Sequence, residues 1–207
     1  MKKKVLVLAL TLALATTAFV GCGKKVTPAP AATTPAATTP AKVVDAVATA
    51  SVVDTNVALE KAMSKDGGKY CISTLKDLTF TKDLVVDGEF KTGKKDDKGA
   101  LVLDAEGKEA TQRKVALYTQ DDKKNVTARF KLTAPKITFN SNYGSLEHGT
   151  FVGDVYVSGK NFKLVNQKIE GNLYFLNEEA QKSFKIADKD TAGYPKSVVT
   201  GKTELKK

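Results

Sequence analysis

Paired carboxylates are the first candidates for chemistry in this sequence, because cleavage of a polysaccharide uses two of them across a cleft. Asp87 and Glu89 lie two residues apart and would share one face of a strand. Gly88 stands between them, however, and a glycine after the apolar run 84–86 favours a turn. We therefore do not assign this pair a catalytic role.

A second group comprises Glu147, His148 and Asp154, in which His148 is a candidate base that a carboxylate would orient. Adjacent residues of a strand point to opposite faces, so Glu147 is poorly placed to orient His148. We expect His148 to be a surface side chain. Serine-centred elbows, zinc-binding helices, phosphate-binding glycine loops and calcium loops have no matching motif here. We predict no catalytic residue, with a polysaccharide-active enzyme as an alternative.

The cysteine and histidine content predicts neither a metal site nor a cofactor. One histidine and two separated cysteines argue against histidine-rich metal sites, zinc ribbons and a disulfide framework. We expect Cys71 to be a small buried side chain.

A short pattern recurs at steps of eighteen residues in the carboxy-terminal half of the chain. Each copy reads apolar, polar or tyrosine, apolar, and the three copies occupy 137–139, 155–157 and 173–175. The last two copies are each led by a glycine, Gly153 and Gly171. Such a unit, with two or three short strands, is the expected size of one coil of a parallel β-solenoid.

The repeat places Thr138, Tyr156 and Tyr174 on the outer face of stacked strands. Two tyrosines on adjacent coils would form a flat aromatic strip that can stack on sugar rings, with Lys136 and Asp154 as neighbouring polar groups. These four residues, the tyrosines with Lys136 and Asp154, are the candidate ligand-binding site. The alternative is that the tyrosines only stabilise the sheet, by about 0.2–1 kcal/mol per pair.

The elements around the repeat complete the predicted fold. Helical spacing of apolar residues predicts a short helix at 56–65 that caps one end, and the polar tail 177–207 caps the other. Further strands are expected at 84–86, 101–103, 115–117, 130–132 and 198–199, with solvated loops at 91–99 and 121–124. We predict an all-β fold, a short right-handed parallel β-helix with an amino-terminal helix cap. An antiparallel β-sandwich is the alternative.

The first residues predict export. Three lysines precede the apolar run 5–20, which is short for a membrane-spanning helix, and the run ends in small residues before Cys22. Val20-Gly21-Cys22 resembles the bacterial lipobox. Phe19 departs from that pattern, which favours leucine three positions before the cysteine. We expect a signal peptide at 1–21, a lipid on Cys22, a linker rich in Thr, Pro and Ala at 22–53, and a folded domain at 54–207.

The net charge and the predicted location limit the classes of binding partner. The formal net charge is +10, and removal of the three leader lysines reduces it to 30 − 23 = +7. A positive balance attracts anionic wall polymers, acidic glycans or a lipid surface, and export argues against nucleic acid. We expect a monomer tethered to the membrane through Cys22, with a polymerising structural protein as the alternative.

The chain resembles a group of short, uncharacterised surface lipoproteins of clostridia and related Gram-positive bacteria. Four segments carry the resemblance, at 59–67, 84–90, 116–119 and 153–157. The glycine-led repeats also resemble those of right-handed β-helix and bactofilin-like proteins. The resemblance implies a location on the outer face of the cytoplasmic membrane, and a β-helix-like fold. It implies no activity, and it supplies no catalytic residues.

Overall fold

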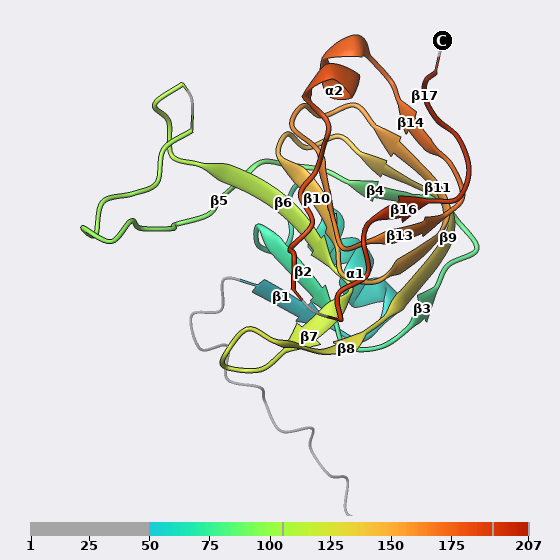
Figure 1. The fold of residues 1–207 in the computed structure, drawn as a ribbon, viewed down its shortest axis with the longest axis horizontal. Helices are drawn as coiled ribbons and strands as arrows, with labels where there is room; N and C mark the ends of the chain where they lie inside the picture. Colours follow the sequence, from blue (N-terminus) through green and yellow to red (C-terminus); the bar gives the residue numbers. More distant parts are fainter. Residues whose placement is uncertain (1–49, 105, 192, 207) are drawn as a thin grey trace, which may run out of the picture. The chain divides into compact units, whose positions relative to one another are not determined.

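Strands that are far apart in the sequence pair in parallel and build two large sheets (Figure 1). The computed structural model describes residues 50–104, 106–191 and 193–206. In the first sheet the strands follow one another in chain order, each parallel to the next. Its strands are β1 (Ala50–Val53), β2 (Cys71–Thr74), β6 (Thr111–Ala116), β10 (Gly144–Glu147), β12 (Lys163–Val165) and β15 (Lys185–Ile186).

The second sheet consists of two parallel rows that share two long strands, β9 (Lys131–Phe139) and β11 (Thr150–Val157). One row adds β3 (Leu78–Thr79), β13 (Lys168–Glu170) and β16 (Val198–Val199) to their first halves. The other row adds β4 (Leu84–Val86), β14 (Leu173–Phe175) and β17 (Thr203–Leu205) to their second halves. Since these pairings are parallel, the antiparallel sandwich is wrong and the all-β class is confirmed.

In the repeat, residues eighteen positions apart in the sequence lie opposite each other on neighbouring strands, as the predicted period requires. Tyr156 pairs with Tyr174, Thr150 with Lys168, and Ser145 with Lys163. Tyr156 also pairs with Thr138 on its other side. The step is longer elsewhere, as between Leu84 and Ile137, because loops and hairpins are inserted between paired strands.

Stacked glycines form the bend between the two rows of the second sheet. Gly153 has a φ of +131° and lies against Ala134 O, with which an added Cβ would collide. Gly171 lies in the same way against the carbonyl of Gly153, and Gly201 against that of Gly171. The glycine lead of the repeat is therefore explained by close backbone approach at this bend.

Alternate side chains of the paired strands point inward and form one apolar core. Fully buried phenylalanines include Phe139, Phe151 and Phe162, and Phe139 packs on Phe162 with ring centroids 4.8 Å apart. Aliphatic side chains at paired positions, such as Val155 and Leu173, stack on one another between them. This burial is the main source of favourable folding free energy.

Helix α1 (Asn56–Met63) confirms the predicted helix and buries Leu59, Ala62 and Met63 in the core. Thr55 caps the helix, because its side chain accepts a hydrogen bond from Ala58 N. Helix α2 (Glu178–Ser183) buries Ala180 and packs against β14 and β17. The two helices contact different strands of the same folded body.

Two excursions leave the parallel strands (Figure 1). Residues 92–104 and 106–110 belong to an arm between β5 (Phe90–Lys91) and β6, which pair in antiparallel fashion. The strand predicted at 101–103 is wrong: this stretch makes only isolated bridges to Lys95 and Glu109, and its side chains are exposed. The second excursion is the hairpin of β7 (Tyr118–Gln120) and β8 (Val126–Arg129), whose turn contains the predicted loop 121–124.

The folded part begins before residue 54, where the sequence places the end of the linker. Residues 50–53 form β1 and pair with β2 from Ala50↔Cys71 to Val53↔Thr74. Within the described ranges, no helix is long and apolar enough to cross a membrane. The predicted signal peptide, Cys22 and most of the predicted linker lie outside the described residues.

Candidate functional site

The two tyrosines of the candidate site lie side by side on the outer face of β11 and β14. Their ring centroids are 5.0 Å apart and the ring planes are inclined by 46°. Both side chains are half-buried, and the column continues to Val85 and Thr138 on one side and to Glu204 on the other. The predicted aromatic pair therefore exists, at the register that the repeat indicates. We call Tyr156, Tyr174, Lys136, Asp154 and Lys206 the tyrosine face.

Lys206, which the sequence analysis did not select, contacts both rings. Its Nζ donates a hydrogen bond to Tyr156 Oη at 2.6 Å and lies 4.6 Å and 4.8 Å from the centroids of Tyr156 and Tyr174. The hydrogen bond to Tyr156 raises the pKa of Lys206. An ammonium group over two aromatic rings is a cation–π arrangement, so the face combines aromatic surface with a fixed positive charge.

The other two predicted residues adjoin the tyrosines but already have partners. Lys136 Nζ lies 5.3 Å from the ring centroid of Tyr156 and forms an ion pair with Asp83 at 2.9 Å. Asp154 Oδ1 accepts hydrogen bonds from the backbone N and side-chain Nδ2 of Asn172. Asp154 thus joins two neighbouring strands, while the side chains of Lys136 and its partner Asp83 are 38% and 50% exposed, so Lys136 can exchange this partner for a ligand.

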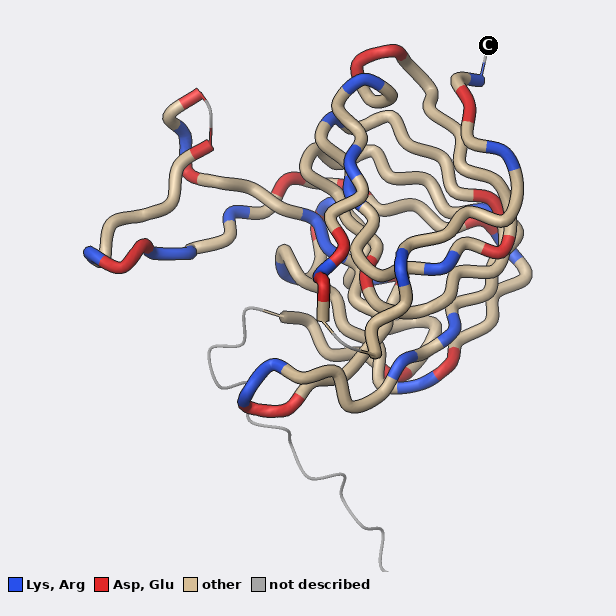
Figure 2. Tube along the Cα trace, in the orientation of Figure 1, with Lys and Arg blue, Asp and Glu red and all other residues tan. Residues whose placement is uncertain are grey.

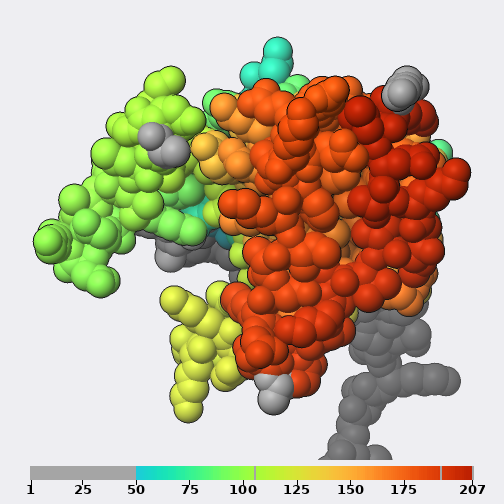
Figure 3. All heavy atoms as spheres, turned by 45° about the horizontal axis from the view of Figure 1, so that its top comes forward, coloured from blue at the N-terminus to red at the C-terminus, as the bar shows by residue number. Residues whose placement is uncertain are grey.

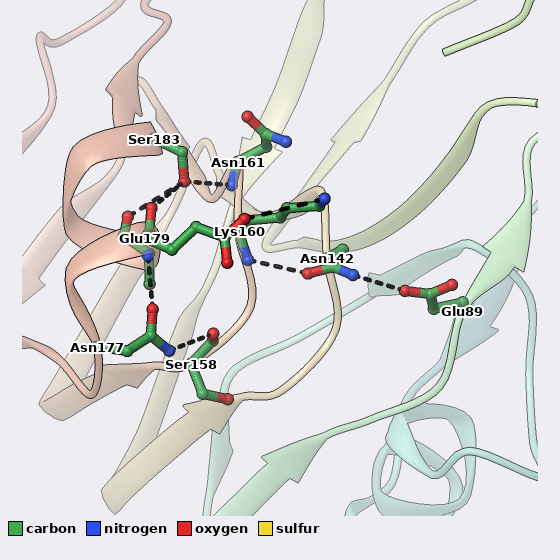
Figure 4. Close-up of polar contacts among 9 residues, drawn as sticks. Glu89, Asn142, Ser158, Lys160, Asn161, Asn177, Glu179 and Ser183 are labelled. Atoms are coloured by element: carbon green, nitrogen blue, oxygen red, sulfur yellow. Dashed lines mark hydrogen bonds and ion pairs between the residues drawn. The ribbon is translucent and has the colours of Figure 1, made fainter. Parts of the chain in front are cut away.

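The candidate carboxylates Asp87 and Glu89 each accept a hydrogen bond from a nearby residue of the protein. Asp87 Oδ1 accepts a hydrogen bond from Gly88 N, and Glu89 Oε1 accepts one from Asn142 Nδ2. Figure 4 shows that Asn142 in turn accepts from the backbone N of Lys160, one repeat further on. These hydrogen bonds link three segments of the fold, so Glu89 has a structural role.

Glu147 lies on a different surface, the outer face of the first sheet. Its Oε2 forms an ion pair with Lys114 Nζ at 2.7 Å, and its Oε1 accepts a hydrogen bond from Ser145 Oγ. Lys114 Nζ also donates to Tyr118 Oη at 3.1 Å. Burial acts to lower the pKa of Lys114, but the Glu147 carboxylate, with smaller contributions from Tyr118 and Cys71, raises it above its usual value, so Lys114 stays charged. Asp154 is on the second sheet, so the structure does not unite Glu147, His148 and Asp154 in one site.

The expectation that His148 is a surface side chain is wrong. The residue is fully buried, has a φ of +63°, and packs between the rings of Tyr118 and Tyr194 at centroid distances of 4.5 Å and 5.3 Å. Neither ring nitrogen has a hydrogen-bond partner among the described residues. Burial lowers the pKa of His148 to about 4, despite the opposing influence of Glu147, so the imidazole is neutral at pH 7.

Cys71 lines a groove of about 350 Å³ on the first sheet, beside Lys114 and Tyr118. Its thiol is half-buried rather than fully buried, and it forms no disulfide. Burial raises the pKa of the thiol, with Lys114 acting in the opposite sense, so the neutral form is favoured.

Positively and negatively charged residues are interspersed along the chain in the folded body and in the arm (Figure 2). Several form exposed pairs, such as Lys168 with Glu170 and Lys196 with Asp190. Within the described ranges, no three His, Cys, Asp or Glu side chains are close enough to hold a metal ion.

Comparison with known proteins adds no family assignment, because no family model, curated protein or solved structure matches the chain. The geometry of the tyrosine face and the sequence itself are therefore the basis for the functional proposal.

Proposed function

We propose that the chain is an extracytoplasmic lipoprotein that acts as a non-catalytic binding module of the cell envelope. The basic residues and apolar run of its first twenty positions, followed by Gly21-Cys22, support export and a lipid on Cys22. Two acyl chains would anchor it without a spanning helix, at roughly 0.8 kcal/mol per buried methylene. The resemblance to clostridial surface lipoproteins supports the outer face of a Gram-positive cytoplasmic membrane as the location.

The proposed architecture is a short right-handed parallel β-helix. Three rows of parallel pairing and the eighteen-residue register of the repeat support it. The right-handed sense follows from the strong preference of parallel crossover connections for that hand. Such a fold places equivalent side chains of successive coils in columns, which is how two tyrosines come to form one surface.

The ligand that best fits the tyrosine face is a carbohydrate or an anionic wall polymer. One observation carries this proposal, the contact between Tyr156 and Tyr174 with Lys206 over both rings. Aromatic rings stack on the apolar faces of sugars, and the ammonium group of Lys206 would meet a carboxylate or phosphate on the same chain. Lys136 supplies a second cation next to Tyr156.

A binding array of glycans and wall polymers tests this function. The full chain is required, since a fragment that starts at residue 54 would lack the paired strand β1. Retention by the wild type and its loss in Tyr156→Ala/Tyr174→Ala would support the proposal. Tyr70→Ala is the matched control, because Tyr70 is a half-buried tyrosine near a lysine on another surface.

Absence of retention by a correctly folded wild type, at low and moderate salt, would contradict the binding function. The tyrosines would then be a stabilising ladder. Circular dichroism melting of each variant separates loss of a ligand contact from loss of folding.

The polymerising alternative is favoured by one observation, the exposed apolar side chains on the outermost strands. Val52 of β1 is 57% exposed, and Ile186 of β15 and Val198 of β16 are similarly accessible. Helix α1, however, packs its apolar face on β1, β2 and β4, which supports a monomer. Sedimentation velocity discriminates the two: a monomer is expected, and species that grow with protein concentration would favour polymerisation.

A further inference from the structure

A pocket of about 230 Å³ lies on the first row of the second sheet, away from the tyrosine face. Thr150, Lys168 and Val198, which begin β11, β13 and β16, are neighbours across this row and line the pocket. Arg129, at the end of β8, and the loop residues Gly149, Pro195 and Lys196 complete the lining. Three of the residues that line this pocket, Arg129, Lys168 and Lys196, carry cationic side chains.

Arg129 is held in place before any ligand arrives. Its Nη1 donates to His148 O at 2.7 Å, and its guanidinium carbon lies 5.0 Å from the ring centroid of Tyr194. Tyr194 is itself fixed, because its hydroxyl accepts a hydrogen bond from Val126 N. This bond ties the β7–β8 hairpin to the segment before β16, and the two lie side by side in Figure 3. A fixed donor loses little conformational entropy on binding.

The remaining donors of Arg129 have no protein partner in the described part of the chain. Arginine carries five N–H donors, and within the described residues the side-chain hydrogen bonds of Arg129 use Nη1 only, to His148 O and, at 3.5 Å, to Asn166 O. No carboxylate of the described residues lies within ion-pair distance of it. Burial also lowers the pKa of Arg129, which reflects a partly desolvated cation without a counter-ion.

The other two cations are paired only with exposed carboxylates. Lys168 contacts Glu170, and Lys196 contacts Asp190, whose side chain is 98% exposed. Exposed pairs of this kind contribute little free energy, so either lysine can turn to a ligand at small cost. The half-buried Thr150 adds a hydroxyl donor at the same place.

We propose that this pocket binds a phosphate group. A planar guanidinium fork with two lysines and a hydroxyl suits a tetrahedral, doubly charged oxyanion better than a single carboxylate. Pro195 and Val198 form an apolar wall beside the charged groups, which leaves room for the small organic part of a phosphate ester. The site does not depend on the tyrosine face, which lies on the other row of the sheet.

Calorimetric titration of the full chain in detergent micelles tests the site, with inorganic phosphate and glycerol 3-phosphate as probes. Binding in the millimolar range is expected, and chloride at equal ionic strength should not displace it. Arg129→Gln should weaken binding by about tenfold or more, since hydrogen bonds to charged groups are being lost. Arg129→Lys should also weaken it, because a lysine cannot reproduce the fork. Lys95→Gln, the same charge change on the arm, should have no effect.

A phosphodiester probe, such as diglyceryl phosphate, distinguishes a phosphate in a polymer backbone from a free or terminal phosphate. Binding as tight as that of the monoester would point to a polymer backbone, and much weaker binding to free phosphate or a terminal phosphate. If Arg129→Gln does not fold, Lys196→Gln and Thr150→Val are the replacement variants, each expected to weaken binding about threefold. The proposal is overturned if the folded wild type binds none of the probes, or if every folded variant binds them as the wild type does.

Discussion

Arg113 joins β6 to the end of helix α1 through its Nη2, which donates to Ala62 O at 2.6 Å. The same nitrogen donates to Ser64 O, and Nη1 donates to Lys69 O. The side chain is fully buried and its guanidinium carbon lies 3.9 Å from the ring centroid of Phe90. Burial lowers the pKa of Arg113 to about 10, yet the group remains charged at neutral pH. One side chain thus satisfies the carbonyls where α1 ends and the chain turns to β2.

Replacement of Arg113 by lysine should therefore destabilise the protein severely. A lysine has three donors on one nitrogen and cannot reach carbonyls on several sides of a planar fork. We expect Arg113→Lys to lower the free energy of unfolding by about 3 kcal/mol or more, as for other broken buried charge networks. Urea unfolding measures the change. A loss below about 1 kcal/mol would show that the fork geometry is dispensable.

Gly153 should not tolerate alanine. Its φ of +131° and the carbonyl of Ala134 leave no room for a Cβ. We expect Gly153→Ala to cost about 3 kcal/mol or more, from strain and displaced strand pairing together. Gly93→Ala on the arm is the matched control, since Gly93 also has a positive φ but has nothing within 4 Å of the added atom. It should cost only about 1 kcal/mol. Equal costs would disprove the role of close approach.

A double-mutant cycle measures the interaction between Tyr156 and Tyr174. The ring separation of 5.0 Å predicts a coupling free energy of about 0.5–1.5 kcal/mol. Tyr156→Ala, Tyr174→Ala and the double variant are compared by urea unfolding. The same cycle between Tyr156 and the distant Tyr70 should give no coupling. A coupling near zero for the first pair would mean that the tyrosines do not stabilise the sheet.

The ion pair of Lys114 and Glu147 predicts an asymmetry between single and double variants. The side chains are only 18% and 8% exposed, so loss of one partner leaves the other charge poorly solvated. Lys114→Met alone should cost about 3 kcal/mol, whereas Lys114→Met/Glu147→Leu should cost clearly less. Chemical denaturation of the three proteins checks this order. A double variant as unstable as the sum of both single variants would contradict it.

The sequence predicts those contacts that recur at its fixed period. Tyr156 and Tyr174 are eighteen residues apart, and the register between them confirms the spacing. The contact between Lys206 and Tyr156 does not follow from the repeat. It depends on the pairing of β14 with β17, in which Leu173 lies opposite Thr203, thirty residues later rather than eighteen.

The sequence does not predict the burial of Arg113, and it predicts a surface position for His148, which is buried. Both lie in stretches that read as polar strand or loop, and nothing local marks them as buried. Arg113 is buried because backbone carbonyls of Ala62, Ser64 and Lys69, more than forty residues earlier in the chain, converge on its guanidinium group. His148 is enclosed by the rings of Tyr118 and Tyr194, which are distant in sequence. Burial of polar side chains by distant segments carries no local pattern.

His148 makes the stability of the fold depend on pH in a defined window. Its pKa is lowered to about 4 in the folded state, against an unfolded value near 6.5. Burial is the main cause. Lys189, Arg129 and Lys114 act in the same direction, while Glu147 opposes them. Between these two pKa values the unfolded chain binds a proton that the folded chain does not, so stability should fall as pH is lowered from about 6.5 to 4.

The chain contains one histidine, so its imidazole resonance can be followed directly by NMR during a pH titration. We expect a midpoint near pH 4 for the folded protein. His148→Asn is the informative variant, because asparagine tolerates the positive φ and does not titrate, and Asn166, eighteen residues further on, adopts a φ of +47°. The variant should lose the decline in stability between pH 6.5 and 5, where most carboxylates are still ionised. A midpoint near 6.5 in the folded wild type would show that the imidazole is solvated.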